Sequence, residues 1–175
     1  MPTPDEITRH HEEGEVIYVG SYPTGYVVRI EEPDHGWAQR YEVLESGIRE
    51  ALGDRVLAVQ HIGSTSVPAL PAKPIIDIDL AVADPTDEAA YVPDLEALGY
   101  VHWLTEPRWH QHRLLKMLTE PRVHLHVGPA TGDDPGDLGA GMRYNPIQEP
   151  VVREIYGRMF EAAGLVSPGS TADNT

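Results

Sequence analysis

Two acidic residues at alternate positions mark an otherwise apolar stretch of this chain. Asp77 and Asp79 lie in the sequence IIDIDLAV at residues 75–82. The apolar composition predicts a β-strand, in which residues two apart point to the same face. Two carboxylates placed side by side repel each other unless a cation or a shared proton lies between them. Hard cations such as Mg²⁺ bind oxygen ligands and share them with substrate phosphates, so this strand predicts one wall of a metal–phosphate site.

The same alternation also fits a plainer structure, a half-exposed strand whose acids face water. Taken alone, the two acids favour that interpretation. The flanking residues change the balance, because residues 74–76 and 80–82 are apolar enough for a buried strand. Acidic residues are seldom fully buried without a partner, and a metal ion is the simplest partner for two of them.

A Gly-Ser loop precedes this strand. Gly63 has no Cβ atom and therefore lets the backbone approach a phosphate closely. Ser64 and Thr65 can add hydroxyl and amide donors to a phosphate oxygen. Lys73, just before the strand, can pair with a phosphate or with the acids. The alternative is an ordinary Gly-Ser turn between two strands, which the nearby acid pair makes the less favoured interpretation.

Histidines are concentrated downstream of the acid pair. His124 and His126 lie on one face of a predicted strand at residues 123–127 that carries no acid. Because histidine exchanges a proton near neutral pH, either ring is a candidate general base, metal ligand or phosphate contact. Imidazole is a softer ligand than a carboxylate and suits Zn²⁺ or Mn²⁺ better than Mg²⁺. The alternative is a half-buried polar strand face without chemistry.

Further histidines and basic residues precede that strand. For His110 and His112 an exposed loop beside Trp109 is the favoured interpretation, and convergence on the acids is the alternative if the strands form a hairpin. Arg113 and Lys116 lie three apart on the next predicted strand. Their side chains should point to opposite faces, so at most one reaches the acids. A surface position on an edge strand is an equally favoured alternative for both.

The residues around the Gly-Ser loop resemble a known family. The string HIGSTSVPALPAKPIIDI, which begins at His61, is similar to that of the GrpB family, a group of small bacterial proteins placed in the DNA polymerase beta-like nucleotidyltransferase superfamily. The superfamily signature is a hydrophobic residue, Gly-Ser, a loop, and then Asp-hydrophobic-Asp. Residues 62–64 and 77–79 match this signature, and the resemblance extends more weakly over about residues 37–160.

This resemblance implies a metal-dependent enzyme that transfers a nucleoside monophosphate from a nucleoside triphosphate to a small acceptor. It implies that Gly63 and Ser64 hold the triphosphate. It also implies that Asp77 and Asp79 bind Mg²⁺ or Mn²⁺ and are catalytic. Active members of the superfamily generally place a third acid on a neighbouring strand.

That third acid is absent from this chain. The matching strand carries His124 and His126 instead, which makes both rings catalytic candidates and His126 the candidate third metal ligand. Arg113 and Lys116 match basic positions of the GrpB pattern. The candidate residues for binding the nucleotide or its phosphates are therefore Gly63, Ser64, Thr65, Lys73, Arg113 and Lys116.

Two other functions stay open at this point. A GrpB-like domain that lost catalysis with the third acid would be a nucleotide- or cofactor-binding module, and such domains also occur fused to a coenzyme A biosynthesis kinase. Alternatively, a transition metal at the histidines would support another chemistry, such as hydrolysis, on the same fold. The sequence does not indicate the nucleotide base, the acceptor or an oligomeric state.

The remaining segments predict an α+β domain with a mixed β-sheet flanked by helices, which is consistent with a nucleotidyltransferase-like fold. Apolar residues at helical spacing predict a helix over residues 37–52, with Asp34 as its N-cap and Gly53 as its C-terminal cap. Two more helices are expected at about residues 91–98 and 149–163. The predicted strands span residues 56–60, 75–82, 100–103, 113–118 and 123–127, after a possible hairpin at residues 16–30.

Length and charge limit the possible functions. The chain has 175 residues, which predicts one domain, here residues 16–166 between a flexible segment at 1–15 and a disordered tail at 167–175. The formal net charge of −15 argues against nonspecific nucleic-acid binding. The sequence has no cysteine, no recognisable signal peptide and no apolar run long enough for a membrane span. We therefore expect a cytoplasmic protein without a membrane partner.

Overall fold

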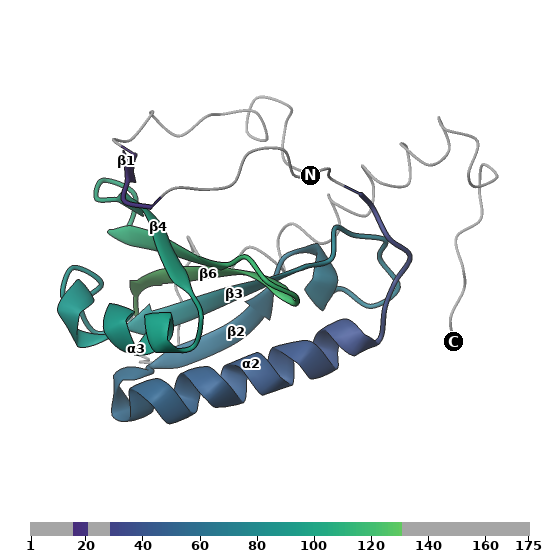
Figure 1. The fold of residues 1–175 in the computed structure, drawn as a ribbon, viewed down its shortest axis with the longest axis horizontal. Coiled ribbons are helices and arrows are strands. Elements are labelled where there is room, and N and C mark those ends of the chain that lie inside the picture. Colours follow the sequence, from purple (N-terminus) through teal and green to yellow (C-terminus); the bar gives the residue numbers. More distant parts are fainter. Residues whose placement is uncertain (1–15, 21–28, 131–175) are drawn as a thin grey trace.

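Six strands form one mixed sheet in the computed structural model, which describes residues 16–20 and 29–130 (Figure 1). The strands are β1 (Ile17–Tyr18), β2 (Ala58–Ile62), β3 (Ile75–Val82), β4 (Val101–Glu106), β5 (His112–Met117) and β6 (Arg122–Pro129). Their order in the sheet is β1-β4-β5-β6-β3-β2. β3 and β6 are parallel, and the other neighbours are antiparallel. The predicted α+β class with a mixed sheet is confirmed.

Several predicted segments lie outside the described residues. They are the flexible segment at 1–15, residues 21–28 of the hairpin at 16–30, the helix at 149–163 and the tail at 167–175. Of the hairpin region, the structure places β1 against β4, with Ile17 opposite Thr105 and Tyr18 opposite Leu104.

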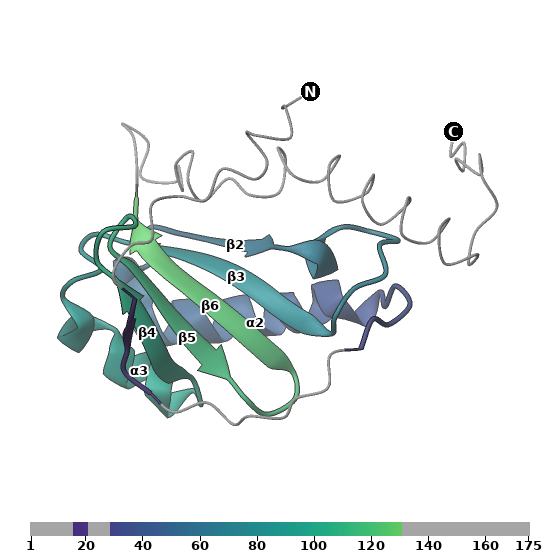
Figure 2. The same ribbon diagram turned by 90° about the horizontal axis from the view of Figure 1, so that it is seen from above.

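Helices cover one face of this sheet. The long helix α2 (Gly36–Leu52) and the short helix α3 (Val92–Ala97) lie on the same side of the sheet in Figure 1. Figure 2 shows α2 running behind β3 and β6. One-turn 3₁₀ helices η1 (Gly53–Arg55), η2 (Ser64–Ser66) and η3 (Glu88–Ala90) connect the larger elements. α2 buries Trp37, Ile48 and Leu52, as the helical spacing of its apolar residues predicted.

Local chemistry sets both ends of α2. Asp34 Oδ1 accepts the N–H of Gly36 at 2.7 Å and so satisfies a donor of the first turn. The residue in the N-cap position is nevertheless His35, one position later than predicted. At the other end Gly53 has a φ of 56°, a left-handed conformation that glycine adopts without strain.

Alternation along β3 separates the two faces of the sheet. Ile76, Ile78 and Leu80 are buried in the core together with Leu115, Val123, Leu125, Val127 and residues of the helices. Asp77 and Asp79 point to the opposite face. The register places Asp77 beside His124 and Asp79 beside His126 on β6. We call the set Asp77, Asp79, His112, Lys116, His124 and His126 the polar face.

Two strand boundaries differ from the prediction in ways that affect this face. β4 continues to Glu106 and β5 begins at His112, so these two residues pair directly across the strands. The preferred prediction of an exposed loop is therefore wrong for His112, whose side chain is buried. It holds for His110, which is exposed.

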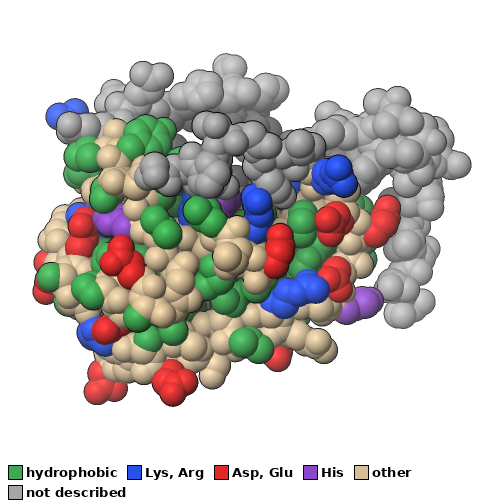
Figure 3. Space-filling model, viewed as in Figure 1, with side chains coloured by type: hydrophobic (Ala, Val, Ile, Leu, Met, Phe, Trp, Pro, Cys, Tyr) green, Lys and Arg blue, Asp and Glu red, His purple; other side chains and the backbone are tan. Residues whose placement is uncertain are grey.

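On the surface in Figure 3, acidic and basic side chains of the described part are intermixed.

Candidate functional site

Asp77 lies where three segments meet on the polar face. β3 carries it between Ile62, the last residue of β2, and His124 on β6. Asp77 Oδ1 lies 3.1 Å from His124 Nδ1, which is within hydrogen-bond distance. The Asp77 side chain stays 25% exposed, so a ligand can reach its carboxylate.

Gly63 brings the Gly-Ser loop against the same carboxylate. It directly follows β2 and has a φ of 70°. A Cβ atom at this position would lie 2.5 Å from Asp77 Oδ2, which is too close for a real side chain. The loop backbone therefore reaches Asp77 only because the residue is glycine. The structure thus places the loop and the acid strand at one site.

Asp79 is the more unusual of the two acids. Its side chain is 2% exposed, and its Oδ2 atom has no hydrogen-bond partner among the described residues. Burial raises its pKa from 3.8 to about 7, and the charge of Asp77 adds to the shift. Buried polar atoms are almost always paired in folded proteins, so this oxygen is an exception, which it shares with the Tyr100 hydroxyl among the described residues.

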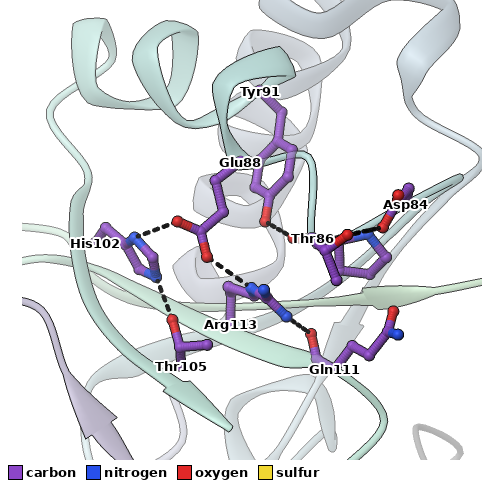
Figure 4. Close-up of polar contacts among 9 residues, drawn as sticks. Asp84, Thr86, Glu88, Tyr91, His102, Thr105, Gln111 and Arg113 are labelled. Carbon is purple, nitrogen blue, oxygen red and sulfur yellow. Dashed lines mark hydrogen bonds and ion pairs between the residues drawn. The ribbon is translucent and has the colours of Figure 1, made fainter. Parts of the chain in front are cut away.

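Of the two basic residues on β5, only Lys116 lies on the polar face. Its Nζ atom stands 3.3 Å from the centre of the Trp103 ring. Burial lowers the pKa of Lys116 to about 8, and the charge of Asp77 opposes that shift. Arg113 points to the helix-covered face, where its Nε donates to Glu88 Oε1 at 2.9 Å (Figure 4). As the alternation predicted, the two side chains point to opposite faces, and Lys116, which pairs with His124, is the one that shares a face with the acids.

The loop residues have different surroundings. Thr65 Oγ1 donates to the Ile75 carbonyl at 3.0 Å and lies 3.0 Å from His61 Nε2. Its single hydroxyl proton is used in the first of these bonds, so this hydroxyl ties the loop to β3; a phosphate contact of Thr65 stays a prediction. Ser64 is half-buried at the start of η2, and Lys73 is exposed just before β3.

Sequence reasoning missed Glu106. Its Oε2 atom lies 2.7 Å from His112 Nδ1, and His112 Nε2 lies 3.0 Å from His126 Nδ1. Burial lowers the pKa of both rings to about 4. The charge of Arg113 lowers the pKa of His112 further, and His112 lowers that of His126 further. Extending the predicted strand at residues 100–103 to residue 106 would have placed this acid opposite His112.

The donors of the polar face do not form a complete protein cage for a metal. Within residues 16–20 and 29–130, no group of three or more histidine or acidic side chains is arranged to hold one. The paired acids Asp77 and Asp79 still fit Mg²⁺, which proteins usually bind through one or two carboxylates together with substrate phosphates. The third predicted ligand, His126, stays a prediction.

Comparison with known proteins places this geometry in a family. The family described as GrpB protein matches residues 27–137, which include the whole polar face. This chain belongs to the GrpB family. That placement is consistent with the DNA polymerase beta-like superfamily and supports a nucleotidyltransferase-like fold. In the described part of this GrpB protein, no helix has the length and apolarity needed to cross a bilayer.

Two bacterial relatives are both described as UPF0157 proteins. A UPF0157 protein of Halalkalibacterium halodurans is 43% identical over 120 residues, which cover 68% of this chain and 61% of the relative. A UPF0157 protein of Streptomyces coelicolor is 45% identical over 106 residues, which cover 60% of this chain and 54% of the relative. The matched region is thus less than two thirds of each relative's length.

Two further similarities are to a solved structure and to a kinase. The crystal structure of conserved protein GrpB from Enterococcus faecalis has a TM-score of 0.56 at 23% identity, over 81% of this chain and 86% of that chain. This likeness shows a shared fold. A dephospho-CoA kinase of Mycolicibacterium paratuberculosis is 36% identical over 76 residues, or 42% of this chain and 19% of the kinase.

Proposed function

We propose that this GrpB protein is a divalent-cation-dependent nucleotidyltransferase that moves a nucleoside monophosphate from a nucleoside triphosphate to a small acceptor. One observation carries the proposal: Asp79 is buried beside Asp77, and its Oδ2 atom has no partner among the described residues. A buried charge without a partner lowers the stability of the fold. Mg²⁺ or Mn²⁺ has the charge and the preference for oxygen that would remove this cost.

The residues around the two acids suit the triphosphate. Asp77 and Asp79 would hold the cation, which supplies positive charge to the phosphate oxygens when it is bound. Gly63 lets the loop backbone approach the phosphates, and Ser64 offers a hydroxyl at the start of η2. Lys116 lies near enough to Asp77 for their charges to interact and adds a second positive charge to the site.

His126 replaces the missing third acid in this proposal. The residue is half-buried, and the surrounding protein lowers the pKa of its ring to about 4. The ring is therefore neutral at pH 7 and has one unprotonated nitrogen, which can accept the proton that the acceptor loses. Its basicity is close to that of the aspartate that it replaces.

Thermal melting of the tag-free full chain tests nucleotide binding. The four ribonucleoside triphosphates are compared with and without Mg²⁺ and Mn²⁺, because a ligand that binds only the folded state raises its melting temperature. We expect a cation-dependent increase with one triphosphate that is lost in Asp77→Asn. The control Asp94→Asn, which changes an exposed acid on α3, should keep it. No increase with any triphosphate would contradict the proposal.

A transfer assay then tests catalysis with the triphosphate so identified. We expect Asp77→Asn to lower the rate by a factor of about 10²–10⁴, because charge stabilisation by a bound cation contributes several kcal/mol. Release of pyrophosphate with a panel of small hydroxyl compounds measures the rate. An unchanged rate in Asp77→Asn would overturn the assigned role of this acid.

A binding module without turnover is the second candidate. Two observations favour it: β6 carries histidines and no acid, and part of the chain is similar to a dephospho-CoA kinase. A cation-dependent melting increase without any product would support this function. An increase with Zn²⁺ or Ni²⁺ alone would instead favour a transition-metal site at the histidines.

A further inference from the structure

Three side chains from three strands form a continuous hydrogen-bonded chain on one side of the candidate site. Glu106 on β4 lies directly opposite His112 on β5. His126 on β6 is diagonal to His112, because its direct partner is Leu114. Cross-strand neighbours at direct and diagonal positions are within side-chain reach. The two contacts, Glu106 Oε2 to His112 Nδ1 at 2.7 Å and His112 Nε2 to His126 Nδ1 at 3.0 Å, follow this register.

The two imidazole rings are well aligned for a hydrogen bond. Their planes differ by 23°, and their centres are 5.1 Å apart. With the facing nitrogens 3.0 Å apart, the contact runs from the edge of one ring to the edge of the other, close to both ring planes. This is the direction in which a ring nitrogen donates or accepts.

Glu106, at one end of the hydrogen-bonded chain, determines which ring nitrogen of each histidine carries a proton. An ionised Glu106 can only accept, so the proton of this contact belongs to His112 Nδ1. In a neutral His112 ring the Nε2 atom then has the lone pair, and it accepts the N–H of His126 Nδ1. His126 therefore keeps its own lone pair on Nε2. His126 pairs with Asp79 in the parallel register of β3 and β6, so its ring lies on the polar face with the two acids.

The turn just before His112 has an unfavourable backbone conformation. His110 has a φ of 50° and Gln111 a φ of 51°, although neither is a glycine. The edge of the adjoining Trp109 ring system packs on His112 with ring centres 4.8 Å apart. Such strain persists only where the surrounding structure maintains it, and here it lies next to the middle member of the chain.

We propose that Glu106 and His112 are positioning residues that hold His126 with its Nε2 lone pair ready to take the proton of an acceptor hydroxyl. This inference rests on the proposed function and deepens it, because it names the residues that position His126 for the transfer. During transfer the acceptor oxygen bonds to the α-phosphorus, and the bond to the pyrophosphate oxygen breaks. The hydroxyl proton goes to His126 Nε2. The protonated ring keeps its Nδ1 proton on the hydrogen bond to His112 Nε2.

Nuclear magnetic resonance of the full chain with ¹⁵N-labelled histidine tests the proton order without any ligand. The signals of His126 are identified by their loss in His126→Phe. We expect the His126 ring proton on Nδ1 in the wild type. Glu106→Leu removes the acceptor that fixes His112, so His112 can turn its proton toward His126 and shift the His126 proton to Nε2. Glu106→Gln is the matched control, because its amide oxygen still accepts from His112.

The transfer assay measures the consequence for the reaction. We expect Glu106→Leu and His112→Phe to lower kcat by about 10–100-fold, the usual effect of removing a group that orients a functional histidine. Glu106→Gln should keep most of the rate, and the KM for the triphosphate should not change in any variant. Melting temperatures show whether each variant is folded. If His112→Phe does not fold, the Glu106 pair alone decides the outcome.

Each result has a defined meaning. A wild-type His126 proton on Nε2, or an unchanged His126 tautomer and rate in Glu106→Leu, would overturn the inference. The predicted tautomer without nucleotide binding or transfer would overturn the proposed function and the proton-accepting role of His126, while the hydrogen bonds among Glu106, His112 and His126 would stand. The predicted tautomer together with a loss of kcat in Glu106→Leu that Glu106→Gln avoids would support both.

Discussion

The two faces of the sheet each carry a cluster of acidic, basic and histidine side chains, and the clusters differ in how completely their polar atoms are paired. On the helix-covered face, Arg113 donates to Glu88 Oε1 at 2.9 Å and to the Gln111 carbonyl (Figure 4). His102 lies 3.9 Å from the other oxygen of Glu88 and 3.2 Å from Thr105 Oγ1. The side chains of this cluster are thus paired with one another and with nearby backbone, and we call it the closed cluster.

On the polar face the pairing is incomplete. Asp79 Oδ2 has no partner within the described part of the chain, although its side chain is as deeply buried as the apolar core. Asp77 Oδ2 faces the glycine loop. The same residue types therefore differ in their pairing: the closed cluster connects η3 to the sheet, whereas the open cluster leaves a buried carboxylate oxygen unpaired at a cost in stability.

Asp79→Asn should sharpen this contrast most, by raising the stability of the cation-free protein. The folded pKa of Asp79 is raised from 3.8 to about 7, so between these values the folded state keeps a proton that the unfolded state has lost. The wild type should therefore lose stability relative to Asp79→Asn as pH rises, by about 1.4 kcal/mol per pH unit. Above about pH 7 the difference should level off at no more than about 4 kcal/mol.

Urea unfolding between pH 4 and pH 8, in the presence of a chelator, measures this difference. A constant difference between wild type and Asp79→Asn across that range would contradict the unpaired state of Asp79. Added Mg²⁺ with the triphosphate should reduce the advantage of the variant, because binding would stabilise only the wild type.

Arg113→Leu should have the opposite pattern, with a loss of stability and no loss of nucleotide binding. Removing one partner of a buried ion pair costs about 3–5 kcal/mol. Because the Glu88 side chain is 38% exposed, we expect about 2–3 kcal/mol by urea unfolding. The control Arg49→Leu removes an exposed pair with Glu45 and should cost less than about 1 kcal/mol. A large increase in the KM for the triphosphate would restore Arg113 to the binding residues.

Gly63→Ala should have a smaller effect on stability and a clear one on binding. Its Cβ would lie 2.5 Å from Asp77 Oδ2, and its φ of 70° disfavours any side chain. We expect a loss of about 1–2 kcal/mol and a weaker cation-dependent melting increase with the triphosphate. Gly47→Ala is the matched control, since its Cβ meets nothing within 4 Å on α2 and should stabilise the helix by about 0.5–1 kcal/mol. An equal melting increase with the triphosphate in both variants would show that the loop does not contribute to nucleotide binding at the acids.

Local patterns predicted much of the fold. The spacing of apolar residues predicted α2, and alternation predicted both the core and the polar face of β3. Alternation also predicted that Arg113 and Lys116 would diverge. The role of the Thr65 hydroxyl was not predictable in this way, because its acceptor is the Ile75 carbonyl on another element.

The sequence by itself determined which side chains share a face, because the period of a strand or a helix is a property of the backbone. It therefore determined the pairing of Asp77 with Asp79 and of His124 with His126. Only the tertiary structure decided which faces meet across strands. The parallel register of β3 and β6 brings His124 to Asp77, and the antiparallel pairing of β4 and β5 brings Glu106 to His112. Such contacts depend on the alignment of distant segments, and that alignment determines which buried polar atoms find a partner and which, like Asp79 Oδ2, do not.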